Sequence, residues 1–137
     1  IVGVATKGGV IPPALRVMLK EALENDFNLV NGLHEYIADI PELVSLAQAR
    51  KLEITDVRKP KKIKDLHFWS GEIINVKCVK VAVLGTDCAL GKRTTTRLLV
   101  ETMRNAGYKA EMIYTGQTGW MQGAPYGFIF DATLNDF

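Results

Sequence analysis

The segment "VKVAVLGTDCALGKRTTTRLLV", residues 79–100, contains the clearest structural signal in the chain. Residues 79–85 have the composition of a buried parallel strand, and a stretch with helical periodicity follows from 91 to 106. Between them lies a glycine-containing loop. When such a loop opens a helix, backbone N–H groups converge on an anion at the positive helix end. The segment therefore predicts a phosphate-binding loop.

The loop departs from the common phosphate-loop pattern, G-x-x-x-x-G-K-[ST]. Gly85 lies one residue too far upstream, so Thr86 occupies the first glycine position. Lys92 is followed by Arg93, and a hydroxyl comes only at Thr94. In ordinary phosphate loops the hydroxyl after the lysine coordinates Mg²⁺, whereas a guanidinium has only donors. We therefore expect a loop that binds phosphates but is poorly equipped for Mg–ATP.

The predicted phosphate-binding residues belong to this loop, to the first turn of its helix and to a second loop after the next strand. They are Gly85, Thr86, Asp87, Cys88, Ala89, Leu90, Gly91, Lys92, Arg93, Thr94, Thr95, Gln117, Thr118 and Gly119. The alternative for the first loop is a glycine turn with a solvated lysine, and for 117–119 a simple glycine turn. Cys88 lies where a thiol pKa is lowered, but with no base within sequence reach it is expected to be a spectator.

The region from 1 to 58 is expected to be part of a Rossmann-like α/β unit, because strand-like and helical segments alternate. The strands are expected at 1–5, 27–32 and 52–58, and the helices at 13–25 and 39–50. Asp39 and Glu42 have the spacing of a capping box for the second helix. His34 and Glu35 follow a predicted strand end and form either an acid–base pair or a pair with structural bonds.

Residues 59–76 are expected to be a linker, and 77–137 the first part of a P-loop domain. The linker begins in "RKPKKIKD" at 58–65, a basic run that is either solvated or a phosphate-binding patch. Further strands are expected at 109–116 and 127–132. The chain begins and ends near apolar strand-like runs, so we expect an interior piece of a longer protein. The fold class is α/β, with two Rossmann-like three-layer units, the second with a P-loop nucleotide-triphosphatase-like fold.

The composition is that of an ordinary globular protein. Of 137 residues, 47% are apolar and 23% charged, and the net charge of +2 supports neither a nucleic acid nor a membrane as partner. Cys78 and Cys88 lack metal-type spacing, which favours a reducing cytoplasm over a disulfide framework. We expect a cytoplasmic homo-oligomer that acts on a small molecule.

Short motifs along nearly the whole chain resemble those of a known family. In chain order they are "GVATKGG", "NGLHEYIAD", "DVRKP", "GTDCALGKRTT", "TGQTGW" and "DATLNDF". They resemble domain-of-unknown-function family 1611, in which a Rossmann-like N-terminal domain precedes a P-loop domain. The resemblance implies a D-glutamate N-acetyltransferase that uses acetyl-coenzyme A. The loop is also similar to that of dethiobiotin synthetase, where threonine stands in place of Arg93.

Three functions stay open at this point. The first is transfer of an acetyl group from acetyl-coenzyme A to an acidic amino acid such as D-glutamate, with Asp87 or His34 as the general base. The second is an ATP-dependent ligase or kinase of the dethiobiotin-synthetase type, in which Asp131 binds Mg²⁺. A helix N-cap is the alternative role for Asp131, and a cap on the loop backbone is the alternative role for Asp87. The third is a nucleotide-binding protein without catalysis.

Overall fold

The computed structural model describes residues 1–65, 69–87 and 90–130, and the chain divides into two compact units. The first consists mainly of Ile1–Lys61 and the second mainly of Lys62–Phe128. The division falls inside the segment 59–76 that was expected to link them. Helices and parallel strands are both present, in agreement with the predicted α/β class.

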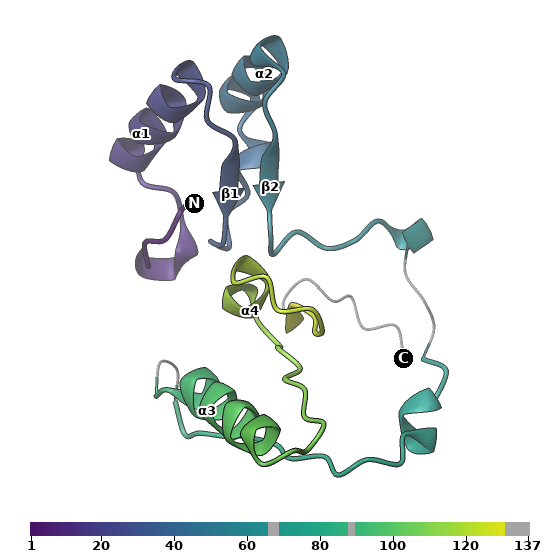
Figure 1. Cartoon of the computed structure of the whole chain (residues 1–137). Helices are drawn as coiled ribbons and strands as arrows, with labels where there is room; N and C mark the ends of the chain where they lie inside the picture. Colours follow the sequence, from purple (N-terminus) through teal and green to yellow (C-terminus); the bar gives the residue numbers. More distant parts are fainter. Residues whose placement is uncertain (66–68, 88–89, 131–137) are drawn as a thin grey trace. The chain divides into compact units, whose positions relative to one another are not determined.

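The first unit is built on a small parallel sheet (Figure 1). Strands β1 (Leu29–Asn31) and β2 (Ile54–Asp56) pair in parallel, with Asn31 opposite Asp56. Val2 adds a parallel bridge to Asn31, so the N-terminal run, which was expected to be a strand, lies beside β1. The bridge does not extend over 1–5. Gly3 contributes no side chain to the packing there, and glycine weakens strands.

Two helices pack with this sheet. Helices α1 (Pro13–Glu24) and α2 (Pro41–Arg50) each have proline at the first helical position, where its fixed φ suits the helix and its missing N–H costs nothing. Buried apolar side chains from the helices, β1 and the connecting loops form the core of the unit. They are Ile11, Leu19, Leu23, Leu29, Leu33, Ile37, Leu43 and Ala47.

The predicted capping box of α2 is wrong. The helix begins at Pro41, later than expected, and its N-cap residue, Ile40, makes no side-chain capping bond. The carboxylate of Asp39 pairs with the Lys59 ammonium at 2.8 Å, and the carboxylate of Glu42 pairs with Lys20 at 2.9 Å. Both acids therefore bind cations from other segments instead of the first N–H groups of the helix.

A polar pair, Asn31 and Asp56, joins the carboxyl ends of β1 and β2. Asn31 is fully buried, and its Nδ2 donates to Asp56 Oδ1 at 2.7 Å and to the Glu35 carbonyl at 2.8 Å. The Asp56 carboxylate also accepts from the backbone N–H groups of Ile37 at 2.9 Å and Ala38 at 2.8 Å. Asp56 therefore holds the turn after β1 against β2.

The second unit contains helix α3 (Lys92–Asn105) and the short helix α4 (Gln117–Met121). Gly107, with φ +86°, follows the end of α3. Its N–H donates to the Arg104 carbonyl and that of Tyr108 to the Met103 carbonyl, each at 2.9 Å. These are the two bonds of a Schellman motif, which needs a left-handed residue at this position.

None of the helices in the described ranges is long and apolar enough to span a membrane.

The strands expected in the second unit are largely missing from its described residues. Residues 79–85 form no strand, and Val79 and Leu84 are 90% and 86% exposed, so the prediction of a buried strand there is wrong. The segment 109–116 and the described part of 127–132, residues 127–130, contribute one parallel bridge, between Tyr114 and Gly127, and residues 131–132 lie outside the described ranges. A parallel strand takes its hydrogen bonds from neighbouring strands. The described part of this unit places no such neighbour beside 79–85.

Candidate functional site

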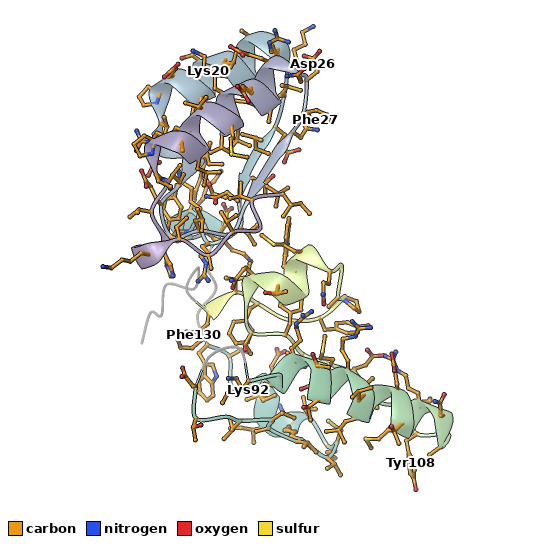
Figure 2. The ribbon with its side chains drawn as sticks, turned by 90° about the vertical axis from the view of Figure 1, so that its left-hand side faces the viewer. Lys20, Asp26, Phe27, Lys92, Tyr108 and Phe130 are labelled. Atoms are coloured by element: carbon orange, nitrogen blue, oxygen red, sulfur yellow. The ribbon has the colours of Figure 1, made fainter. Side chains whose placement is uncertain are left out.

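The candidate site lies where the glycine-containing loop meets α3. Gly91 precedes the helix with φ +89°, a left-handed conformation that favours glycine. Lys92 is the first residue of α3, so its predicted place in the first turn of this helix is confirmed, and Figure 2 shows it at the start of α3. The first N–H groups of a helix have no partner within it, and the N-cap residue of α3, Gly91, has no side chain that could accept from them. This helix end therefore has the geometry of an anion-binding site.

The Lys92 side chain folds back over the loop. Its ammonium donates to the Asp87 carbonyl oxygen. A Cβ atom added at Gly85 would lie 3.0 Å from Lys92 Cδ and 3.4 Å from Nζ. Gly85 is therefore close enough to the lysine that a side chain there would push it aside. Although Gly85 stands one residue outside the usual pattern, it leaves the space in which the loop lysine lies.

Arg93 is hydrogen-bonded to a residue that is distant in the sequence. Its guanidinium Nη1 donates to Oε1 of Gln122, the residue directly after α4. Gln122 was not among the predicted site residues, because no local pattern connects positions so far apart. Thr94 and Thr95 are exposed in the first turn of α3, and their predicted role in phosphate binding stays a prediction.

The predicted second loop, residues 117–119, is the beginning of helix α4 and not an open turn. Gly119 is buried, and a Cβ there would lie 2.5 Å from Tyr114 Cγ. This glycine therefore permits close packing of α4 on the tyrosine. Contact of Gln117 and Thr118 with a ligand stays a prediction.

His34 and Glu35 have structural bonds. Their backbone N–H groups both donate to the Gly9 carbonyl, at 3.1 and 3.0 Å. The Glu35 carboxylate accepts from the Arg16 guanidinium at 2.8 Å and from the Ile11 N–H. Of the two interpretations of this pair, the structure favours the structural one for Glu35. The His34 side chain is exposed, and its role as a base stays a prediction.

Three predicted site residues, Cys88, Ala89 and Asp131, lie outside the described residues. Asp87, the other proposed base, lies within the described loop, and its carbonyl holds Lys92. Among the described residues no cluster of three or more acidic, histidine or cysteine side chains has the geometry of a metal site.

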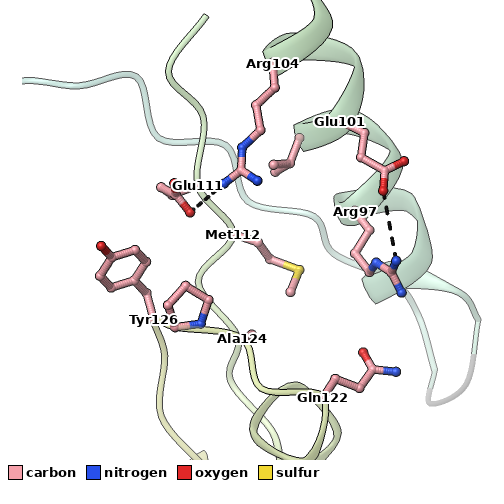
Figure 3. A pocket seen from close by; sticks show the side chains of 10 residues that line it. Arg97, Glu101, Arg104, Glu111, Met112, Gln122, Ala124 and Tyr126 are labelled. Atoms are coloured by element: carbon pink, nitrogen blue, oxygen red, sulfur yellow. Dashed lines mark ion pairs between the residues drawn. The ribbon is translucent and has the colours of Figure 1, made fainter.

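A pocket of about 620 Å³ lies between α3 and the segment that follows it (Figure 3). This volume is within the range of small-molecule sites. Arg104 pairs with Glu111 at 2.8 Å and Arg97 with Glu101 at 4.0 Å, so charges of both signs border the pocket. Its other lining residues are Val100, Met112, Gln122, Ala124, Pro125 and Tyr126. Gln122 thus borders the pocket and also accepts the hydrogen bond from Arg93.

Both units match family models. Residues 1–60 match "Domain of unknown function (DUF1611_N) Rossmann-like domain", and residues 67–137 match "Domain of unknown function (DUF1611_C) P-loop domain". The whole chain is 31% identical to a protein named D-glutamate N-acetyltransferase from a Pseudoalteromonas species. It is 32% identical to a protein of the same name from Tritonibacter scottomollicae. The chain spans 40% of the length of each of these curated relatives.

A solved structure is also similar. The crystal structure of a DUF1611 family protein from Anabaena variabilis superposes with a TM-score of 0.83 at 40% sequence identity. The match covers 98% of this chain and 38% of that one. The fold described above is therefore shared with an experimentally determined relative.

Proposed function

Because this chain belongs to the DUF1611 family, with a Rossmann-like domain followed by a P-loop domain, we propose that it binds acetyl-coenzyme A for transfer of the acetyl group to an acidic amino acid. The motif resemblance to this family is thereby confirmed. Two relatives named D-glutamate N-acetyltransferase support the reaction and its substrate class.

The observation that carries the proposal is the pair of cations, Lys92 and Arg93, in the first turn of α3. Coenzyme A has a pyrophosphate and a 3′-phosphate, and both need to be bound without being hydrolysed. Two cationic side chains in the first turn of a helix, where the backbone N–H groups have no intrahelical partner, fit this requirement. An arginine after the loop lysine contributes bidentate hydrogen bonds to phosphate where other loops have a ligand for Mg²⁺.

In the proposed reaction, Lys92 and Arg93 hold the phosphates. Bound acetyl-coenzyme A supplies a thioester, whose carbonyl carbon forms a bond with the amine nitrogen while the carbon–sulfur bond breaks. The departing thiolate takes the proton that the nitrogen loses as it becomes an amide, and leaves as the free thiol. The acceptor must first lose a proton from its ammonium group, and the proton goes to a general base. Asp87 and His34 are the candidates for that base.

The test is calorimetric titration of the full-length protein with coenzyme A and with ATP, each with EDTA and with Mg²⁺. We expect coenzyme A to bind equally well in both buffers. We also expect release of free thiol from acetyl-coenzyme A when D-glutamate is added. Binding of ATP that requires Mg²⁺, without binding of coenzyme A, would favour the ATP-dependent ligase instead. Binding without turnover of either compound would favour a non-catalytic nucleotide-binding protein.

A further inference from the structure

We infer that Gln122 is a positioning residue for Arg93, and that α4 holds this glutamine against the phosphate loop. The inference rests on the proposed function, since it treats Arg93 as a phosphate ligand. It adds to the loop a second segment, residues 116–122, that the loop motif does not contain.

The first step is the chemistry of the contact. Arg93 Nη1 donates to the side-chain carbonyl oxygen of Gln122, which is an uncharged acceptor. The other two arginines of α3 have carboxylates as partners, Arg97 with Glu101 at 4.0 Å and Arg104 with Glu111 at 2.8 Å. A carboxylate would offset the charge of the guanidinium, whereas an amide fixes its orientation and leaves the charge intact. The remaining N–H groups of Arg93 then stay suited to an anion.

The second step is the rigidity of the segment that carries Gln122. Tyr114 lies against two glycines: a Cβ at Gly119 would lie 2.5 Å from Tyr114 Cγ, and one at Gly127 would overlap the Tyr114 carbonyl oxygen. That carbonyl also accepts from the Phe128 N–H at 2.9 Å. The Gln122 N–H donates to the carbonyl of Thr118, a residue of α4, at 3.2 Å. The backbone of Gln122 is therefore fixed relative to Tyr114.

Together these contacts indicate that α4 positions Gln122. The helix has only 5 residues, and its Gly119 is its buried residue, so it adds little apolar surface to a core. Its close packing on Tyr114 instead determines where Gln122 lies, and Gln122 determines the direction of the Arg93 guanidinium. Arginine has several rotatable bonds, and restricting them before binding lowers the entropy cost of binding.

The test is a double-mutant cycle in the full-length protein, with coenzyme A affinity measured by calorimetry in EDTA. Gln122→Ala should weaken binding by about 2- to 10-fold, the range for losing one hydrogen bond. In the Arg93→Ala background, the same change should have no effect, because the group that it positions is gone. Gln122→Glu retains the acceptor but offsets the charge of Arg93, so it should weaken binding more than Gln122→Ala. Gln48→Ala, at an exposed glutamine of α2, should leave the affinity unchanged.

The outcomes separate this inference from the proposed function. The positioning role would be overturned if Gln122→Ala reduced coenzyme A affinity equally in the unmodified protein and in Arg93→Ala. It would also be overturned if Gln122→Glu bound coenzyme A with full affinity. If Gln122→Ala does not fold, Gln122→Glu carries the test alone. If ATP binds and coenzyme A does not, the proposed function fails, and the same cycle run with ATP still decides the role of Gln122. If neither compound binds, both are refuted.

Discussion

Replacement of Lys92 by alanine tests the phosphate site most directly. The Lys92 ammonium lies over Gly85, held by the Asp87 carbonyl, at the start of α3. A charge-assisted hydrogen bond contributes roughly 1.5–3 kcal/mol. Lys92→Ala should therefore reduce coenzyme A affinity by about 10- to 150-fold. The measurement is calorimetric titration of the full-length protein in EDTA.

The matched control is Lys109→Ala, because Lys109 is an exposed lysine of the same unit. This variant should bind coenzyme A as the unmodified protein does. A loss of less than about 3-fold in Lys92→Ala, or an equal loss in both variants, would refute the assignment of Lys92 as a phosphate ligand. In that case the helix N–H groups alone, or another site, would account for binding.

Arg93→Thr is the companion change, since it restores the hydroxyl of the common phosphate loop. We expect weaker binding of coenzyme A in EDTA, because one cation is lost, and stronger binding of Mg–ATP, because threonine supplies a metal ligand. Unchanged preference between the two compounds would show that this position does not select the ligand.

Three further predictions concern stability. Gly119→Ala would place a methyl group 2.5 Å from a tyrosine ring atom and should destabilise the protein by about 1–3 kcal/mol in chemical denaturation. Gly116→Ala, which meets no atom within 4 Å, is its control, and equal effects would contradict the packing argument. Asp56→Ala leaves three hydrogen-bond donors without their acceptor and should cost about 3 kcal/mol; a loss near zero would refute its structural role. The hydrogen bond to the Asp39 carboxylate raises the pKa of Lys59, so the pair should stabilise the fold below pH 10.5 and lose this effect as pH rises through the raised pKa. Asp39→Asn should remove this alkaline dependence in denaturant titrations on both sides of pH 10.5.

Tertiary contacts decided several features that the sequence did not predict. The spacing of Asp39 and Glu42 is that of a capping box, yet both carboxylates bind lysines from other segments. The apolar composition of 79–85 is typical of a buried strand, but strand hydrogen bonds need a neighbour that the described residues do not supply. In each case the outcome depended on which other segment folded nearby.

The features that the sequence determined by itself are those with local causes. Helix α3 lies between Gly91, directly before it, and Gly107, which stops it two residues after Asn105; both glycines accept a left-handed conformation, and this preference belongs to the residue itself. The position of Lys92 in the first helical turn follows from the same local rule. The partner of Arg93 does not follow from a local rule. Gln122 lies 29 positions further along the chain, and the sequence pattern of the loop does not extend that far. Backbone preferences act within a few residues, whereas the orientation of a long charged side chain depends on whichever distant group the fold places beside it.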